Sequence, residues 1–377
     1  MFSYRFRHRL QRWFTLTVVW LIVALILAFQ KHLMLHSELV GEHLPISMLV
    51  TIKSEMFGAF LGAIFGGALM IFFFQDRFRD WKLINAILIQ AAIYIPMMLS
   101  VTMVASFFYN SLSMNLPFWD KAVAIKVIQF MGSADQLVIF LNWSIILVIS
   151  VWVLAISEKF GPGQLTKMLL GKYHKPTEET RIFMFLDLKG ATTLAEKIGH
   201  QLYFDLLKKS FDEITEPVLM SKGEIYQYVG DEVVISWTLE NGLTNNNCID
   251  CYFRIQDKLR SSKPYFLSKF GIIPDFKAGV HVGKVMVGEV GMAKRERIFS
   301  GDVLNTASRI QGQCKAFDLD ILISGELESY LIDRKGLEIE FLEAATLKGK
   351  NSYVNLYSVK KGKTLHVRRD TDMITVA

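Results

Sequence analysis

The sequence has little cysteine and little proline for its length, with three cysteines and eight prolines among 377 residues. Three thiols cannot build the dense disulfide framework of a small secreted domain. Cys248 and Cys251 form a CxxC pair, but a zinc site needs four ligands and no histidine stands at a matching spacing. We therefore expect two reduced thiols on a helix in a reducing compartment.

Charge is nearly absent from four long stretches, although 21% of all residues are charged. These stretches are residues 13–29, 56–74, 83–108 and 137–156. Each is long enough to cross a hydrocarbon layer of roughly 30 Å as a helix, which takes about 20 residues. The first stretch has no small-residue cleavage site behind it, so it does not resemble a signal peptide. The sequence therefore predicts a membrane domain of four transmembrane helices in residues 1–157.

Basic residues mark one side of the membrane. Four arginines precede the first predicted span, and Arg77, Arg79 and Lys82 fill the loop after the second. By the positive-inside rule the N-terminus is cytoplasmic, and four crossings return the second half of this multi-pass protein of the cell membrane to the cytoplasm. The net charge of +6 largely reflects this signal, so we expect no nucleic-acid binding.

Two features of the predicted membrane domain concern contacts. Gly58, Gly62 and Gly66 fall on one face of the second span, where small residues let two helix backbones approach closely. Their partner is either a second copy of the chain or another helix of the same chain, and the sequence leaves both open. Residues 117–131 show a helical pattern and are expected on the outer surface, as a cap over a site for an unknown stimulus.

Two segments in the second half each end a predicted strand with a carboxylate. Residues 181–196 (RIFMFLDLKGATTLAE) begin with an apolar run typical of a strand buried on both faces, and Asp187 stands at its end. In residues 223–237 (GEIYQYVGDEVVISW), two strand patterns flank a Gly-Asp turn that carries Asp231. Either aspartate alone is explained by helix capping or by a turn. Side by side in one sheet, they would need a cation such as Mg²⁺ or Mn²⁺ between them.

Two further groups suit a bound nucleotide. Backbone N–H groups at Gly190, Ala191 and Thr192, where a helix begins, are placed to cradle phosphates. Residues 301–313 (GDVLNTASRIQGQ) put Asn305 and Arg309 on one face of a helix, at i and i+4. An amide and a fixed-charge guanidinium suit an enzyme that holds a ribose and stabilises charge at phosphorus.

The second half alternates predicted strands and helices. Helices are expected at residues 194–199, 202–219, 248–260 and 303–314, and closing strands at 321–324, 339–343 and 354–359. Residues 276–290 are expected to form two strands that meet at Gly283. Long helices on one face of an antiparallel sheet make an α+β domain.

Together the three motif segments resemble the catalytic domain of the class III nucleotidyl cyclases, the adenylate and guanylate cyclase family. The resemblance implies a ferredoxin-like α+β catalytic domain at residues 181–360, behind the four-helix transmembrane region. It also implies a cytoplasmic linker or transducing element at residues 158–180 and a tail at 361–377. The implied activity is conversion of a nucleoside triphosphate to the 3′,5′-cyclic nucleotide plus pyrophosphate, for intracellular signalling.

The resemblance assigns roles to the motif residues. Asp187 and Asp231, with the backbone carbonyl of Leu188, would hold two metal ions per active site, Mg²⁺ or Mn²⁺. Asn305 and Arg309 would orient the ribose and stabilise the transition state. Because this family takes the metal ligands from one subunit and the Asn/Arg helix from the other, one chain with one set of each implies a homodimer.

Base recognition departs from the family pattern. Gln227 and Ile298 stand where adenylate cyclases usually have a Lys and an Asp or Thr, and where guanylate cyclases usually have a Glu and a small residue such as Cys. Gln227 both donates and accepts hydrogen bonds, whereas Ile298 offers only shape. Base choice is therefore open: ATP is the default substrate because it is the commonest in the family, and guanylate, pyrimidine or relaxed specificity is the alternative. The resemblance also implies that Lys348, in an LKGK segment, contacts the triphosphate.

Two other functions are weighed against this one. Residues 229–232 (VGDE) resemble the GGDEF turn of diguanylate cyclases, but those enzymes lack the helix of Asn305 and Arg309. The second alternative is a nucleotide-binding membrane sensor that has lost turnover. Retention of all the catalytic charges speaks against it.

Overall fold

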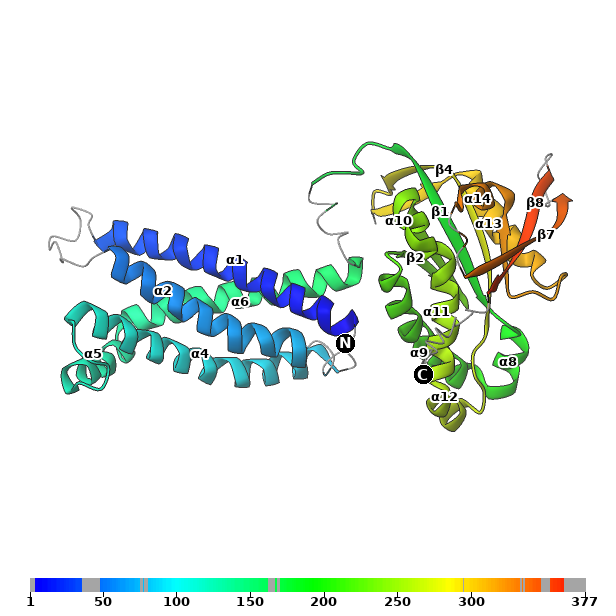
Figure 1. Cartoon of the computed structure of the whole chain (residues 1–377). Coiled ribbons are helices and arrows are strands. Elements are labelled where there is room, and N and C mark those ends of the chain that lie inside the picture. The colour runs from blue at the N-terminus through cyan, green and yellow to red at the C-terminus, as the bar shows by residue number, and fades with distance from the viewer. Residues whose placement is uncertain are drawn as a thin grey trace, which may run out of the picture. The chain divides into compact units, whose positions relative to one another are not determined.

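The computed structural model of the chain describes residues 4–35, 48–74, 77, 81–161, 167, 170–293, 295–332, 334, 336–346 and 353–362 (Figure 1). The chain divides into two compact units, Met1–Lys159 and Phe160–Ala377. We describe each unit by itself. Most of the predicted tail and part of the predicted linker lie outside the described residues.

The first unit is a bundle of long apolar helices (Figure 1). Its helices are α1 (Tyr4–Leu35), α2 (Met48–Gly62), α4 (Leu83–Met114), α5 (Lys121–Met131) and α6 (Ala134–Phe160), and α2 continues through the π-helical stretches η2 (Ala63–Gly67) and η3 (Leu69–Phe74). Four segments are long and apolar enough to cross a membrane: Phe6–Leu33, Met48–Phe74, Leu88–Met114 and Ala134–Ser157. This confirms the four predicted apolar helices, and the segments indicate membrane association. The short helix α5 lies at the end of the bundle opposite the N-terminus (Figure 1).

The glycine face of α2 packs inside the chain. A Cβ atom added at Gly58 would lie 3.2 Å from the Cβ of Ala105 on α4, and one at Gly66 would lie 2.9 Å from the Cε of Met97. The indole of Trp20 on α1 donates a hydrogen bond of 2.9 Å to a hydroxyl of α6. Of the two partners left open by the sequence, the structure therefore shows helices of the same chain.

The second unit is built on one eight-stranded sheet, in which seven strands follow the order β2-β3-β1-β4-β6-β8-β7 and β5 pairs with β4. The strands are β1 (Thr177–Leu188), β2 (Glu224–Val229), β3 (Glu232–Thr238), β4 (Phe276–Val290), β5 (Glu296–Ser300), β6 (Ile321–Ser324), β7 (Leu337–Thr346) and β8 (Tyr353–Lys361). All pairings are antiparallel except β4 with β6. The expected antiparallel sheet is wrong for that pair, because a helix carries the chain back between the two strands.

Helices cover both faces of the sheet. They are α8 (Ala191–Ile198), α9 (His200–Met220), α10 (Leu239–Leu243), α11 (Asn247–Ser261), α12 (Lys263–Phe270), α13 (Asp302–Gln313) and α14 (Gly325–Tyr330), with a 3₁₀ turn η4 (Thr244–Asn246). On one face, Ile182 and Met184 of β1 pack in a core with α9 and α11. On the other, Phe183 and Phe185 pack against α13. The α+β fold is confirmed. The expectation that helices cover only one face of the sheet is wrong, because a strand that is apolar on both faces needs cover on both sides.

The strand β4 is continuous, so the expectation of two strands meeting at Gly283 is wrong. A Cβ atom at Gly283 would lie 3.2 Å from the Cβ of Val303 on α13. One at Gly279 would lie 2.2 Å from the backbone nitrogen of Gln311. These glycines mark the close approach of α13 to the sheet rather than a chain reversal.

The three cysteines are buried free thiols. Burial raises the pKa of Cys248 and of Cys251 to about 12, which leaves both in the unreactive thiol form. The expected reduced pair on a helix is confirmed.

Candidate active site

The strand β1 delivers Asp187 to one edge of the site. Its register places Asp187 opposite Glu232 of β3 and Lys277 of β4. The next residue, Leu188, is almost fully buried, with 2% of its side chain exposed. Gly190 then takes a left-handed conformation, with φ of 66°, and α8 begins. The predicted strand end and helix start are therefore in place.

Asp231 reaches the same place from the neighbouring hairpin. It follows Gly230, whose φ of 62° suits the tight turn between β2 and β3. It also directly precedes Glu232, the cross-strand partner of Asp187. Burial, the negative charge of Asp231 and a side-chain hydrogen bond to it raise the pKa of Asp187 to about 6. The sheet thus brings the two predicted carboxylates together.

The negative charges of Asp187 and Asp231 also raise the pKa values of neighbouring side chains. Burial, followed by the charges of Asp187 and Asp231, raises the pKa of Glu232 to about 7. Burial and the same two charges also raise the pKa of Tyr203 on α9. The site is therefore a concentration of negative charge in a partly buried place.

Gln311 is a site residue that the sequence did not reveal. Its Nε2 atom donates a hydrogen bond of 3.3 Å to Oδ2 of Asp187. This contact depends on the close seat of α13 on β4 at Gly279, which no local sequence pattern reports. Gln311 thus holds one carboxylate oxygen of Asp187 in place.

The donor set fits a hard divalent cation. Within the described ranges, no group of three or more His, Cys, Asp or Glu side chains is arranged to hold a metal ion. A pair of carboxylates nevertheless suits Mg²⁺, which usually keeps waters and takes substrate phosphates as its other ligands. The raised pKa of Asp187 shows that its ionised form lacks compensation in the chain alone.

The start of α8 presents backbone donors. The N–H group of Leu194 donates a hydrogen bond of 2.9 Å to the carbonyl of Gly190, which is the first hydrogen bond of the helix. The N–H groups before it, including those of Ala191 and Thr192, have no partner within the helix. Space around Gly190 is open, since an added Cβ atom would meet nothing within 4 Å. The turn has the form expected of a phosphate cradle.

Asn305 and Arg309 lie on one side of α13. The buried face of α13 carries Val303, Ala307 and Ile310, which occupy the opposite side of the helix. Among the described residues, neither Asn305 nor Arg309 has a hydrogen-bond or ion-pair partner for its side chain. One chain therefore presents the two halves of the predicted site without joining them.

The base-recognition positions lie on two strands that do not pair with each other, since β2 pairs with β3 and β5 pairs with β4. Gln227 is exposed on β2 and Ile298 is partly buried on β5. The strands meet next to these positions, where the N–H group of Phe299 donates 3.3 Å to the hydroxyl of Tyr226. The structure shows no direct contact between Gln227 and Ile298 within its described residues. Lys348 lies outside those residues.

Comparison with known families decides what this arrangement is. Residues 173–361 match the model of the adenylate and guanylate cyclase catalytic domain. The chain belongs to this family. Its second unit is thus an adenylate and guanylate cyclase catalytic domain rather than the diguanylate cyclase domain weighed above. Divalent metals and homodimers are typical of the family.

Two relatives and one solved structure illustrate the likeness. Adenylate cyclase 2 of Rhizobium meliloti (strain 1021) is 32% identical over 212 residues, covering 56% of this chain and 58% of that protein. Adenylate cyclase 1 of the same organism is 27% identical over 181 residues, covering 47% and 27%. This chain thus spans less than two thirds of either relative. The structure of a bacterial light-regulated adenylyl cyclase is 19% identical, covers 60% of this chain and 66% of that one, and shares the fold with a TM-score of 0.51.

Proposed function

We propose that this chain is a membrane-anchored nucleotidyl cyclase that converts a nucleoside triphosphate, ATP by default, to its 3′,5′-cyclic nucleotide and pyrophosphate. The observation that carries the proposal is the pairing of Asp187 with Asp231 at the strand ends, where burial and the charge of Asp231 raise the pKa of Asp187. The names of the relatives, both adenylate cyclases, favour ATP.

Asp187 and Asp231, with the carbonyl of Leu188, would hold Mg²⁺ or Mn²⁺, two per active site. Bound there, these ions supply positive charge that neutralises the triphosphate and lowers the pKa of the ribose 3′-hydroxyl. Gln311 positions one oxygen of Asp187, so that the ligand geometry is set before substrate arrives. The N–H groups at Gly190 and beyond would bind phosphate oxygens.

A homodimer would complete the site. Asn305 is exposed and Arg309 is partly buried on α13, and neither side chain is engaged among the described residues, as expected of groups that act on a nucleotide held by another copy. Asn305 would hold the ribose, and the fixed charge of Arg309 would face the α-phosphorus as the 3′-oxygen bonds to it and pyrophosphate leaves. Lys348 is proposed to contact the β- and γ-phosphates. Two equivalent sites follow from the two-fold symmetry of such a dimer.

Gln227 and Ile298 would face the base of the nucleotide. Neither carries a charge, so neither is left as an unpaired ion when a different base binds. Guanylate or relaxed specificity is therefore the alternative within the same activity. A catalytically silent nucleotide-binding sensor is the alternative outside it.

The membrane unit would anchor the enzyme in the cell membrane with its N-terminus and the cyclase unit in the cytoplasm. The arginines in the first turns of α1 and the basic loop after the second span support this orientation. Residues 158–180 would link the two units and transmit a signal.

The test incubates the purified full chain with Mn²⁺ and each of the four nucleoside triphosphates separately, and identifies the products by mass. We expect a 3′,5′-cyclic nucleotide and pyrophosphate from ATP, and none from an Asp187→Asn chain. Metal-dependent nucleotide binding without any cyclic product would contradict the proposed activity and favour the silent sensor.

A further inference from the structure

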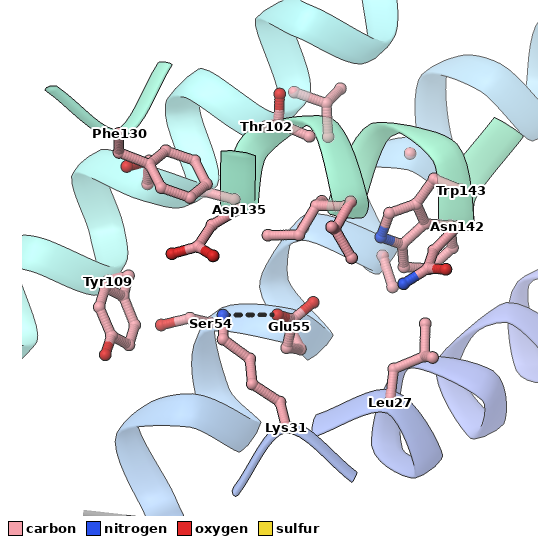
Figure 2. Close-up of a pocket in the computed structure, with 18 of the residues that line it drawn as sticks. Leu27, Lys31, Ser54, Glu55, Thr102, Tyr109, Phe130, Asp135, Asn142 and Trp143 are labelled. Atoms are coloured by element: carbon pink, nitrogen blue, oxygen red, sulfur yellow. Dashed lines mark hydrogen bonds and ion pairs between the residues drawn. The ribbon is translucent and has the colours of Figure 1, made fainter. Parts of the chain in front are cut away.

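Lysine–carboxylate contacts occur in both units, and they differ in how many acids share one cation. In the helical unit, Lys31 pairs with Glu55 at a distance of 3.3 Å, on the wall of a pocket between the helices (Figure 2). In the cyclase unit, Lys284 pairs with Glu178 at 2.9 Å. An isolated, partly exposed pair of this kind contributes little to stability. Lys189 is different, because two acids hold it.

Lys189 lies between the end of β1 and the start of α8. Its ammonium donates hydrogen bonds to the carboxylates of Asp275 and Asp320. Its backbone N–H group donates a further hydrogen bond of 2.9 Å to the carbonyl of Asp275. The lysine side chain is 26% exposed, whereas those of the two acids are 50% and 56% exposed. Three charges and one backbone bond therefore form a network, which is the case in which ion pairs near a surface matter.

The two acids stand where two further strands begin. Asp275 directly precedes β4, and Asp320 directly precedes β6. The carbonyl of Asp320 accepts a hydrogen bond of 2.8 Å from the N–H group of Ala278 on β4. Lys189 therefore ties the end of β1 to the first residues of two other strands of the same sheet. We call Lys189, Asp275 and Asp320 the lysine clamp.

The residues on either side of Lys189 are held differently. Leu188 is fixed by its buried side chain and by its pairing with Phe276 of β4. Gly190 has no side chain, and a Cβ atom added there would meet nothing within 4 Å. Lys189 thus supplies the attachment to the sheet that Gly190 cannot supply, at the turn that begins the expected phosphate cradle.

We propose that Lys189 is a positioning residue for triphosphate binding, and that the lysine clamp fixes the turn at Gly190 so that the first N–H groups of α8 face phosphate oxygens. This inference rests on the proposed cyclase function and adds a residue to that site. The cradle binds the phosphates both before and during the reaction. Losing its placement therefore raises KM more than it lowers kcat.

The alternative role for Lys189 is direct contact with a phosphate, and the two roles predict opposite effects of removing the acids. Asp275 and Asp320 would withhold a phosphate-binding lysine, so without their charges triphosphate binding would be unchanged or tighter. A lysine that positions the turn needs both acids, so their removal weakens binding as removal of the lysine does. Both acids are about half exposed, and changing them to Asn leaves no buried charge unpaired.

The test measures KM and kcat of the full chain with Mn²⁺ and the triphosphate that it cyclises. Lys189→Met, and separately Asp275→Asn with Asp320→Asn, should each raise KM about tenfold and change kcat less than about threefold. All three changes together should raise KM no further, because the same clamp is already lost. Lys189→Arg keeps a cation with several donors and should stay within about threefold of the unaltered KM. An unchanged or lower KM in the variant without the two acids would overturn the proposal.

The matched control is Lys284→Met, which removes an ammonium from the single pair with Glu178 on the same sheet. It should change KM less than about twofold. A rise in KM as large as that in Lys189→Met would mean that the loss of any lysine charge weakens binding, and would overturn the assignment to the clamp.

Hydrogen exchange without nucleotide separates a failure of this inference from a failure of the proposed function. The amide protons of Lys189 and Leu194 are bonded to the carbonyls of Asp275 and Gly190. Both should exchange about tenfold faster without the clamp acids, and at the unaltered rate in Lys284→Met. Unchanged exchange at both amides would contradict the clamp even in an active enzyme. Faster exchange in a chain that makes no cyclic product would overturn the cyclase function, and the positioning role with it, while the clamp itself stands.

Discussion

Glu224 and Asp187 are two acids of one sheet whose pKa values move in opposite directions. Burial alone would raise both. A 2.7 Å hydrogen bond from Lys167 and the charge of Arg181 nevertheless lower the pKa of Glu224 to about 2. Asp187 has another acid, Asp231, as its neighbour, and its pKa rises to about 6. The pKa values of the two acids differ because their charged neighbours differ, not because one acid is more deeply buried.

Glu224 belongs to a cluster in which cations of the same chain compensate its charge, whereas Asp187 and Asp231 form a pair without such cations among the described residues. We call the first the complete cluster and the second the incomplete pair. Arg181 is fully buried, and it donates 2.9 Å to Glu179 while lying 3.5 Å from Glu224. In that cluster the charge of Glu224 is compensated by cations of the same chain, so the cluster serves the fold. In the described parts of the chain, Asp187 and Asp231 form no ion pair. Perturbed acids without a compensating partner are typical of functional sites.

The largest effect is expected from removing a charge of the incomplete pair. Asp187→Asn or Asp231→Asn should lower turnover with Mn²⁺ at least about a hundredfold, because a metal ligand is lost. Without metal, Asp187→Asn should raise the melting temperature at pH 8. A carboxyl whose pKa is raised by folding stabilises the folded state at pH values below its unfolded pKa of 3.8. This stabilisation is lost as the pH rises through the folded pKa of about 6, so the ionised Asp187 is unfavourable at pH 8.

The control for this prediction is Asp257→Asn, an exposed acid that lies 3.4 Å from Lys361. It should change neither turnover nor melting temperature noticeably. Turnover near the unaltered rate in either site variant would mean that the two aspartates hold no essential cation.

The next effect concerns the complete cluster. Glu224→Gln should lower the free energy of unfolding of the cyclase unit by about 3 kcal/mol, because it removes the acid from a buried group of cations. Denaturant unfolding of the full chain in detergent measures this. The matched control is Glu178→Gln, which breaks an exposed pair with Lys284 and should cost under about 1 kcal/mol. Equal losses of unfolding free energy in Glu224→Gln and Glu178→Gln would mean that the buried cluster stabilises the fold no more than an exposed ion pair.

Lowering the pH should also destabilise the cyclase unit through Glu224. The pKa of Glu224 falls from 4.5 to about 2 on folding, so its contribution is fully present above pH 4.5 and is lost as pH falls toward 2. The gap in unfolding free energy between the unaltered chain and Glu224→Gln should therefore be wide at pH 6 and narrower at pH 3. Unfolding curves at both pH values check this. A constant gap would show that Glu224 acts by packing alone.

The smallest effect is expected at the base positions. Gln227→Lys with Ile298→Asp should raise the ratio of kcat/KM for ATP over GTP about tenfold or more, since a charged pair rejects a base that leaves it unmatched. The two changes belong together because either charge alone would lack its partner. Kinetics with both nucleotides on both proteins give the answer. An unchanged ratio would assign base choice to other residues.

The sequence predicted the elements that carry local signals. Four charge-free runs, the apolar strand before Asp187 and the turn at Asp231 each follow from composition and spacing within one segment. One of the errors concerns glycine. Gly283 resembles a turn signal, but its lack of a side chain serves the approach of α13, which only the folded sheet reveals.

Contacts between distant segments could not be predicted. Gln311 meets Asp187 across 124 positions of sequence, and no periodicity or motif marks such a pair. Tertiary packing decides which polar groups are satisfied, and local patterns do not report it.

The central claim is that one chain supplies the aspartate pair and another supplies Asn305 and Arg309. Mixed dimers of Asp231→Asn and Arg309→Ala chains, purified through two different tags, test it most directly by their cyclase rate. Such a dimer has one intact composite site, so we expect up to half of the unaltered activity, with either variant alone inactive. An inactive mixed dimer, shown to contain both chains, would contradict the shared site.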